Sequence, residues 1–401
     1  MSNVPKLRFK EFSGKWEEKP LGKYGKLING LTYSPDNIVE NGLLVLRSSN
    51  IQNEQISFED NVYVNLNVED EYLTCENDIL ICVRNGSKRL IGKSLLIPKN
   101  LPKSTHGAFM TVFRGDSNKF ISHWLKTPMF FKEVHKNLGA TINSINGSNL
   151  KKFKTFFPNS KEEQEKIASF LTSVDSKIEQ LTKKEELLQQ YKKGVMQKIF
   201  NQEIRFKADD GNDFCEWEEY SLKNFLVPTL REIEKPKENY LAIGVRSHCK
   251  GTFQKPDSEP DKIAMDTLYV VKENDLIVNI TFAWESAIAI VKKEDEGGLV
   301  SHRFPTYTFD EKISNSKYFQ YVIIQKRFRL MLDLISPGGA GRNRVMSKKD
   351  FLKLKWELPC IAEQKKIANF LSSIDKKTEL VQIELEKTKE FKKALLQQMF
   401  V

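Results

Sequence analysis

Residues 86–94, with the sequence GSKRLIGKS, contain the glycines, lysine and serine from which a phosphate-binding loop is made. In such a loop the backbone amides surround the phosphates, which requires four residues between the two glycines. Here five residues separate Gly86 from Gly92. The additional residue would displace the amides, so we predict a glycine-containing hairpin and not a nucleotide site.

The other segments that could support catalysis also lack part of the required pattern. The glycine-rich segment 337–341 follows a predicted helix, unlike a dinucleotide-binding loop, so a flexible loop is the better interpretation. Pro256-Asp257 is not followed by the strand-borne acidic-x-Lys motif of a metal-dependent nuclease, and His248-Cys249 has no further ligands at zinc spacing. The Pro-Pro-aromatic motif of an adenine methylase is absent. We therefore predict no catalytic residue and no metal ligand in this chain.

Polar side chains are frequent in the loops that follow predicted strands. Arginine, asparagine, serine and threonine can hydrogen-bond to base edges or to phosphates. The same residue types also form turns, and we expect that role for about half of them. In the strongest cluster, Arg342-Asn343-Arg344, two guanidinium groups flank an amide beside three glycines. The DNA-binding candidates are Arg47, Ser49, Asn50, Arg84, Asn85, Ser87, Lys88, Thr105, His106, Asn143, Ser144 and Asn146, followed by Arg246, Ser247, His248, Asn279, Thr281, Ser301, His302, Arg303, Arg342, Asn343 and Arg344.

The chain is basic, with a formal net charge of +10 and an isoelectric point of about 9.1. A basic excess favours an anionic partner such as nucleic acid, although a merely basic protein gives the same total. All thirteen arginines lie outside the segments 161–200 and 361–400, which together account for only +3 of the charge. Arginine is suited to bidentate contacts with guanine and phosphate, so the blocks outside these segments are the predicted DNA readers. Arg8, Arg205 and Arg327 are candidates for structural ion pairs instead.

The five cysteines are scattered and form no Cys-x-x-Cys motif, which favours reduced thiols and a cytoplasmic location. The first residues contain no apolar core of a signal peptide, and no apolar run approaches the roughly 20 residues that span a bilayer. We therefore predict a nucleic-acid partner and no membrane.

The sequence contains an internal repeat. Residues 163–200 and 363–400 align without a gap at an offset of 200 residues, and sixteen of the 38 positions are identical. Upstream, NLKKFKTFFP at 149–158 corresponds to DFLKLKWELP at 350–359. The chain therefore consists of two copies of one plan, a globular block of roughly 160 residues followed by a segment of about 40.

Both 40-residue segments are predicted to be helices. They are rich in Lys, Glu, Gln and Leu, they contain no proline, and Gly194 is their only glycine. Their apolar residues are spaced alternately three and four apart, as in the seam of a coiled coil. A surface helix on a larger domain would show a similar pattern, but the repetition favours two helices that pack against each other. Packed antiparallel, two equivalent helices would relate the blocks by a pseudo-twofold axis.

The globular blocks have the pattern of mixed α/β domains. Short β-like runs such as LLVLR at 43–47 and DLIVNI at 275–280 alternate with Asn-Gly, Gly and Pro turns. Residues 123–137 and 317–335 are predicted helices late in each block. The predicted fold class is therefore α+β, with two α/β domains separated by two long antiparallel coiled-coil helices.

In combination these features resemble the specificity (S) subunits of Type I restriction–modification systems, over essentially the whole chain. Each block opens with Trp-Glu-Glu, at 16–18 and 217–219, and has an Asn-Asp strand entry, at 77–78 and 274–275. Each block then continues through a proline into Glu-Gln-x-Lys-Ile-Ala-x-Phe-Leu. The resemblance implies a target recognition domain at 1–158, a central spacer helix at 159–200, a second recognition domain at 201–359 and a C-terminal spacer helix at 360–401.

The resemblance also implies a function. In that family each recognition domain reads one half of a split, asymmetric target in double-stranded DNA, and the helices set the distance between the halves. The subunit binds two methyltransferase (M) subunits, which methylate adenine, and restriction (R) subunits, which translocate and cleave DNA. S-adenosylmethionine, ATP and Mg are therefore expected on partner subunits, with no cofactor in this chain. The alternative is a stand-alone DNA-processing enzyme, a nuclease or a nucleotide-dependent enzyme of similar architecture.

Overall fold

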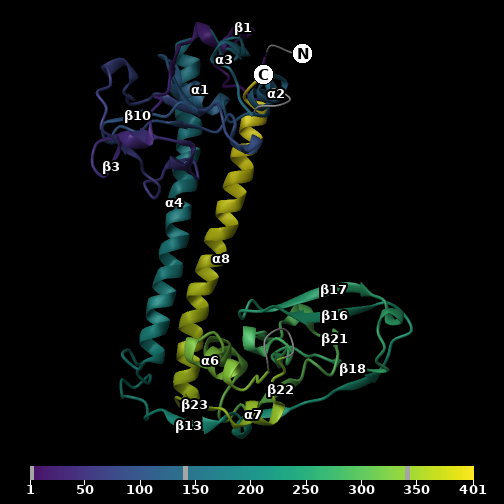
Figure 1. The fold of residues 1–401 in the computed structure, drawn as a ribbon. Coiled ribbons are helices and arrows are strands. Elements are labelled where there is room, and N and C mark those ends of the chain that lie inside the picture. The colour runs from purple at the N-terminus through teal and green to yellow at the C-terminus, as the bar shows by residue number, and fades with distance from the viewer. Residues whose placement is uncertain (1–3, 139–142, 339–343) are drawn as a thin grey trace. The chain divides into compact units, whose positions relative to one another are not determined.

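The computed structural model describes residues 4–138, 143–338 and 344–401. The chain divides into two compact units, and each combines one globular block with part of both long helices (Figure 1). Unit 1 comprises Met1–Glu185 and Leu380–Val401, and unit 2 comprises Glu186–Glu379. Both units mix helices with strands, which confirms the predicted α+β class.

The two segments of about 40 residues are single long helices, α4 (Lys161–Phe200) and α8 (Ile361–Gln398) (Figure 1). In unit 1, Asp175 of α4 binds Lys392 of α8 at 2.7 Å, and Glu185 of α4 accepts a hydrogen bond from Gln382 of α8 at 2.7 Å. Residue numbers rise along α4 as they fall along α8. The helices are therefore antiparallel, as predicted. Among the described residues, no helix is long and apolar enough to cross a membrane.

One ion pair between the helices is formed twice. In unit 1 it joins Asp175 of α4 to Lys392 of α8, and in unit 2 it joins Asp375 of α8 to Lys192 of α4. The aspartates are counterparts in the repeat, 200 residues apart, and so are the lysines. Each long helix thus supplies the aspartate of one pair and the lysine of the other.

Each long helix begins beside a buried glutamate. Arg8 donates to Glu163 at 2.7 and 2.8 Å, and Arg205 donates to the counterpart Glu363 at 3.4 and 2.9 Å. Both carboxylates are at most 2% exposed, so each depends on its arginine for charge compensation. Arg8 and Arg205 thus form the structural ion pairs expected for them, and Arg327 lies 3.8 Å from Glu357 in an exposed pair.

Unit 1 contains two four-stranded sheets, in the orders β2-β11-β8-β9 and β10-β4-β7-β3. All pairs are antiparallel except the parallel pair β10–β4. A two-stranded sheet, β1-β12, and the hairpin β5-β6 complete the unit. The elements are β1 (Glu17–Pro20), β2 (Lys26–Asn29), β3 (Ile38–Val39), β4 (Leu43–Leu46), β5 (Ile51–Gln52), β6 (Gln55–Ile56), β7 (Tyr63–Val64), β8 (Ile79–Cys82), β9 (Ser94–Leu96), β10 (Ser104–His106), β11 (Met110–Arg114), α1 (Asn118–Trp124), α2 (Pro128–Asn137), α3 (Gly147–Lys151) and β12 (Lys154–Phe157).

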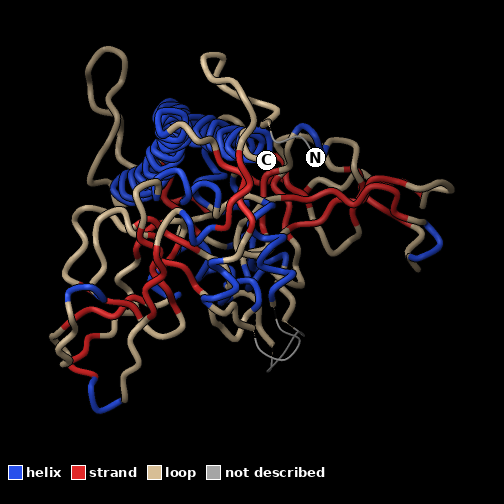
Figure 2. Tube along the Cα trace, turned by 90° about the horizontal axis from the view of Figure 1, so that it is seen from above, coloured by secondary structure: helices blue, strands red, loops and turns tan. Residues whose placement is uncertain are grey.

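Unit 2 repeats this plan. Its sheet β14-β22-β19-β20 has the strand order of β2-β11-β8-β9, and β13-β23 corresponds to β1-β12. Its second sheet has five strands, in the order β15-β18-β21-β16-β17, and strands and loops make up most of each block (Figure 2). The elements are β13 (Glu218–Ser221), β14 (Leu226–Pro228), β15 (Glu232–Glu234), β16 (Tyr240–Val245), β17 (Thr252–Ser258), β18 (Thr267–Val270), β19 (Leu276–Val278), β20 (Ile288–Ile290), β21 (Leu299–Val300), β22 (Thr306–Phe309), α5 (Ser316–Val322), α6 (Lys326–Leu334), α7 (Lys348–Lys353) and β23 (Lys355–Leu358).

The core of unit 1 draws on both ends of the chain. Trp16 and Phe120 lie against Phe400, with ring centroids 6.3 and 5.3 Å apart. Phe400 is only 4% exposed and follows the end of α8. Burial of aromatic rings is a large source of stability, so the last residues of the chain complete a core that begins near its start.

Candidate nucleic-acid interface

Three loops of unit 1 that contain predicted DNA-binding residues meet in the structure. The backbone of Arg84 forms an isolated bridge with Ser144. The backbone NH of Asn85 donates to the carbonyl of Asn143 at 3.2 Å, and its side-chain amide donates to the Ser48 hydroxyl at 3.0 Å. The loops after β4, after β8 and before α3 therefore form one surface, although they are far apart in the sequence.

An exposed aromatic ring extends this surface. The Arg84 guanidinium lies 5.7 Å from the ring centroid of Phe109, a residue that is 55% exposed. Phe109 stands in the short connection between β10 and β11. An arginine held over an exposed ring can contact phosphate or a base with little loss of side-chain entropy, because the ring already restricts it. Phe109 was not among the residues predicted from the sequence.

Three predicted residues of unit 1 are buried. Asn50 donates to the carbonyls of Ser57 and Asp60 at 3.0 and 3.3 Å. Thr105 donates to a backbone carbonyl at 2.9 Å, and the His106 ring nitrogen Nε2 lies 3.0 Å from another. Burial lowers the pKa of His106 below its usual range, which favours the neutral ring. In this structure these side chains hold loops and strands together and do not face solvent.

The other predicted residues of unit 1 lie at or near the surface. Arg47 binds the Asp60 carboxylate at 2.8 Å, and hydrogen bonds from Ser49 and Arg47 lower the pKa of Asp60. Ser87 and Lys88 are exposed on the loop after β8. Asn146 caps α3 by accepting from the Ser148 backbone NH at 3.1 Å.

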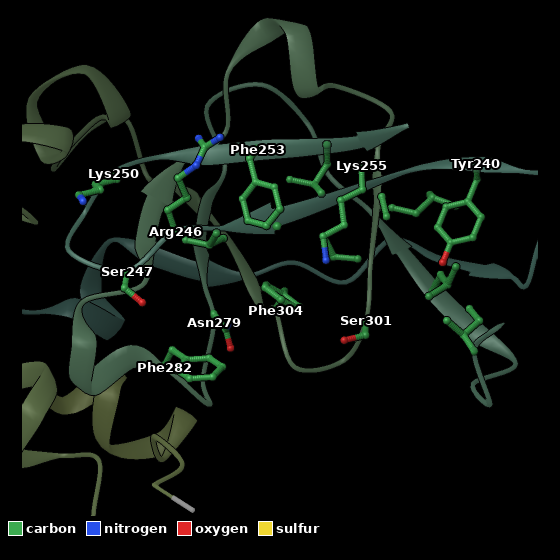
Figure 3. Close-up of a pocket in the computed structure, with 18 of the residues that line it drawn as sticks. Tyr240, Arg246, Ser247, Lys250, Phe253, Lys255, Asn279, Phe282, Ser301 and Phe304 are labelled. Carbon is green, nitrogen blue, oxygen red and sulfur yellow. The ribbon is translucent and has the colours of Figure 1, made fainter. Parts of the chain in front are cut away.

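Unit 2 has a cavity of about 640 Å³ beside the hairpin β16–β17 (Figure 3). The loops that follow β16, β19 and β21 border it. Five predicted residues line the cavity: Arg246, Ser247, His248, Asn279 and Ser301.

The polar groups of this cavity are held by bonds within unit 2. The Arg246 guanidinium donates to the Thr252 carbonyl at 2.7 Å. The Ser247 hydroxyl donates to the Glu285 carboxylate at 2.6 Å, and the Glu285 carbonyl accepts from the backbone NH of His248 at 2.7 Å. His248 has a φ of 63°, so a left-handed turn presents its exposed side chain.

The remaining predicted residues of unit 2 that the structure describes lie on neighbouring loops. Arg303 is exposed, and its guanidinium donates to the Thr281 hydroxyl at 3.4 Å. His302 is also exposed. Arg344 donates to the Asp333 carboxylate at 2.7 Å and lies 5.2 Å from the ring centroid of Trp284. The predicted residues Arg342 and Asn343 lie outside the described residues.

Residues 86–94 do not have the form of a phosphate loop. They form a short 3-10 turn at Lys88–Leu90 that leads into β9, so no helix follows whose N-terminal amides could bind phosphate. The Lys93 ammonium donates to the Ile51 carbonyl. Within residues 4–138, 143–338 and 344–401, no group of three or more His, Cys, Asp or Glu is placed to hold a metal ion.

The sequence matches the family described as "Type I restriction modification DNA specificity domain" twice, over residues 13–189 and 216–390. The chain belongs to this family. The two matches coincide with the two halves of the repeat, and together they cover most of the chain. It is a Type I restriction–modification specificity subunit, as the resemblance implied, and the alternative of a stand-alone enzyme is not favoured.

Named relatives agree with this assignment. The chain is 27% identical to the provisionally named type I restriction enzyme MjaX specificity subunit of Methanocaldococcus jannaschii, over 98% of this chain and 95% of that protein. It is 23% identical to the type I restriction enzyme StySPI specificity subunit of Salmonella potsdam, over 88% and 80%. The crystal structure of a Type I restriction–modification S subunit from M. genitalium has the same fold, with a TM-score of 0.62, 16% identity and 99% coverage of both chains.

In this specificity subunit the unit 2 cavity also contains residues that sequence reasoning missed. Phe253 and Lys255 line it, together with Lys250, Phe282 and Phe304. Phe253 and Lys255 are two residues apart on β17, so alternation along a strand places them on one face. That spacing of an aromatic and a cation was the signal that could have found them.

Proposed function

We propose that this specificity subunit binds double-stranded DNA through both globular blocks, each of which reads one half of a split target. The observation that supports this most directly is the repetition of one block plan, with the same order in two of its sheets. Two similar readers joined by antiparallel helices suit a target with two separated halves. We place the readers at 1–158 and 201–359, and the spacer helices at 159–200 and 360–401.

For the first reader we propose the surface around Arg84, Asn85, Asn143 and Ser144, together with Phe109. For the second we propose the cavity residues Arg246, Ser247, His248, Asn279 and Ser301, with Thr281, His302, Arg303 and Arg344 on neighbouring loops. We add Arg342 and Asn343 from the sequence alone, because they lie outside the described residues. We propose that Arg47, Ser49, Ser87 and Lys88 contact the DNA backbone. Asn50, Thr105, His106 and Asn146 would then act indirectly, by holding the reading loops.

The partners follow from the family. We propose that the chain binds two M subunits, which methylate adenine within the target, and R subunits, which cleave DNA. S-adenosylmethionine, ATP and Mg would be bound by those partners, and this chain would contribute specificity alone. A location in the cytoplasm follows, because the DNA and the partners are there.

Exchange of one block tests this proposal. Residues 1–158 are replaced by the matching block of another specificity subunit, and methylated adenines are mapped in cells that also contain the M subunits. We expect one half of the methylated sequence to change and the other half to remain. The reciprocal exchange of 201–359 should change the other half. A change in both halves after either exchange would contradict independent reading.

A second assay addresses the alternative of a stand-alone enzyme. The purified chain should hydrolyse no ATP, and Lys93→Ala should have no effect on that result, because Lys93 is bonded to a backbone carbonyl. ATP hydrolysis that is abolished by this substitution would favour the alternative.

A further inference from the structure

The unit 2 cavity has an aromatic lining and a cationic border. Phe253, Phe282 and Phe304 line it and are only partly buried (Figure 3). Arg246, Lys250 and Lys255 also line it and are exposed, while the described lining residues include no aspartate or glutamate. An apolar hollow bordered by positive charge is complementary to a ligand that joins a flat ring to an anion.

The ring of Phe253 holds two of these cations. The Arg246 guanidinium lies 5.0 Å from its centroid and the Lys255 ammonium lies 5.4 Å from it. The ring itself lies across the backbone of Gly244, where an added Cβ would come within 2.3 Å of it. Glycine at 244 is therefore needed for Phe253 to take this position beside the cavity. The arrangement fixes an aromatic face and two cations before any ligand binds.

A stacked DNA duplex does not fill such a hollow. Its base edges are recessed in the grooves, so they are read by side chains that protrude, and its protruding groups are charged phosphates. A cavity with aromatic walls instead accepts a base that has left the stack, as in proteins that extrude a nucleotide or bind single strands. Asn279 and Ser301 lie in the lining near Phe282 and Phe304, where an amide and a hydroxyl can pair with a base edge (Figure 3).

We propose that the unit 2 cavity receives one nucleotide of the DNA target, turned out of the duplex. The base stacks on the cavity's phenylalanine rings, and Arg246, Lys250 and Lys255 bind the flanking phosphates. This inference rests on the proposed function, because it requires that unit 2 binds DNA. It adds that recognition of this half of the target includes local opening of the duplex.

The test removes single bases from the half of the target that unit 2 reads. The chain, with its M subunits, is titrated with duplexes that carry an abasic site at each position of either strand in turn. At one position, loss of the base should weaken binding by roughly 5- to 150-fold, the range for stacking of one base on an aromatic side chain. Loss of the base opposite should strengthen binding, because the pair no longer has to be opened.

A variant connects that position to the cavity. Phe304→Leu keeps an apolar side chain but removes the aromatic face, and it should weaken binding of the intact duplex within the same range. On the duplex that lacks the proposed base, Phe304→Leu should have little further effect, because the stacked pair is already absent. Tyr191→Ala, at an exposed aromatic of α4 in the same unit, is the control and should bind both duplexes as the wild type does. Thermal unfolding checks that both variants are folded.

Three results would overturn the inference, and they separate its failure from a failure of the proposed function. In the first, binding is sequence-specific, but removal of a single base from either strand never strengthens it. In the second, the losses of binding caused by Phe304→Leu and by base removal are additive. In both cases the cavity binds no base and the proposed function stands. If the complex binds no DNA sequence specifically, the proposed function fails and the inference fails with it.

Discussion

His123 should make unit 1 sensitive to acid. It lies on α1 with 4% of its side chain exposed, 3.2 Å from the Thr172 hydroxyl and 3.8 Å from the Asp175 carboxylate of α4. Burial lowers the pKa of His123 from 6.5 to about 4, and the positive charges of Lys126 and Lys392 act in the same direction. Asp175 and the nearby Glu54 oppose this shift but do not outweigh it.

The pKa shift sets the size and the pH range of the effect. Because the folded pKa lies below 6.5, the unfolded chain binds more protons than the folded chain between pH 6.5 and about 4. The stability that neutral His123 contributes is therefore complete above pH 6.5 and is lost as the pH falls towards 4. Between pH 7.5 and pH 5 the loss is about 2 kcal/mol. For a unit of this size that lowers the unfolding temperature by about 4–8 °C.

The second repeat provides the matched substitution. In unit 2, Tyr321 of α5 occupies the corresponding place, and its hydroxyl donates to the Asp375 carboxylate at 2.9 Å. Burial raises the pKa of Tyr321, so this contact does not titrate in the acid range. His123→Tyr should reproduce the contact with Asp175, and His123→Gln should keep a hydrogen-bonding group of smaller size.

Thermal unfolding of the full chain at pH 7.5 and pH 5 measures the effect. We expect the wild type to lose about 4–8 °C more than either variant in the transition of unit 1. Acid-sensitive groups elsewhere affect all three proteins equally and cancel in the comparison. If the variants lose as much stability as the wild type between the two pH values, the buried neutral histidine is not the cause and the reasoning is wrong.

Three further changes probe other contacts. Arg205→Ala leaves the buried Glu363 without its counter-charge, so the free energy of unfolding should fall by about 3–5 kcal/mol in a urea titration. Arg205→Lys should give an intermediate loss. A loss below about 1 kcal/mol for Arg205→Ala would contradict this prediction. Burial alone would raise the pKa of Glu54, but its ion pairs with Lys126 and Lys392 lower that pKa to about 2. Glu54→Gln removes the charge that binds the β5–β6 hairpin to α8, so amide hydrogen exchange in the hairpin should become faster. Unchanged exchange would show that the ion pairs do not hold the hairpin. Insertion of four residues after Glu185, with a paired insertion near Leu385, adds about 6 Å of helix and should lengthen the gap between the half-targets by one or two base pairs. Methylation of a DNA library with different gap lengths measures this change. An active variant that keeps the original gap would mean that the helices do not set the distance between the half-targets.

The long helices could be predicted from the sequence because their signals are local. The absence of proline and the regular apolar spacing extend over 40 residues, and each of these segments forms a single long helix. Their pairing followed from the repeat, since each apolar stripe needs a partner. Short strands, by contrast, are stabilised by partners from distant parts of the chain, so only the class of each block could be predicted and not its strand order.

The candidate interface was predicted less well for a related reason. Asn50 and Arg84 follow strands and Thr105 lies within β10, yet Asn50 and Thr105 are buried and only Arg84 is exposed. A polar side chain in or near a strand either forms hydrogen bonds within the protein or remains free to contact a ligand. Only the tertiary contacts decide between these two roles. The aromatic residues Phe109 and Phe253 were missed because single aromatics in short β segments resemble core residues.

The division of unit 1 between the two ends of the chain has a consequence for synthesis on the ribosome. The block that is translated first lacks the residues 380–401 and cannot bury Trp16 and Phe120 against Phe400 until these are made. All of unit 2 is translated in the interval, about 200 residues at roughly 5–20 residues per second, or some 10–40 s. Unit 2 is therefore the first of the two units that can complete its fold. In a nascent chain that stalls in this interval, the aromatic core of unit 1 is incomplete and accessible to chaperones and proteases. Unit 1 can complete its core only after translation has reached Phe400.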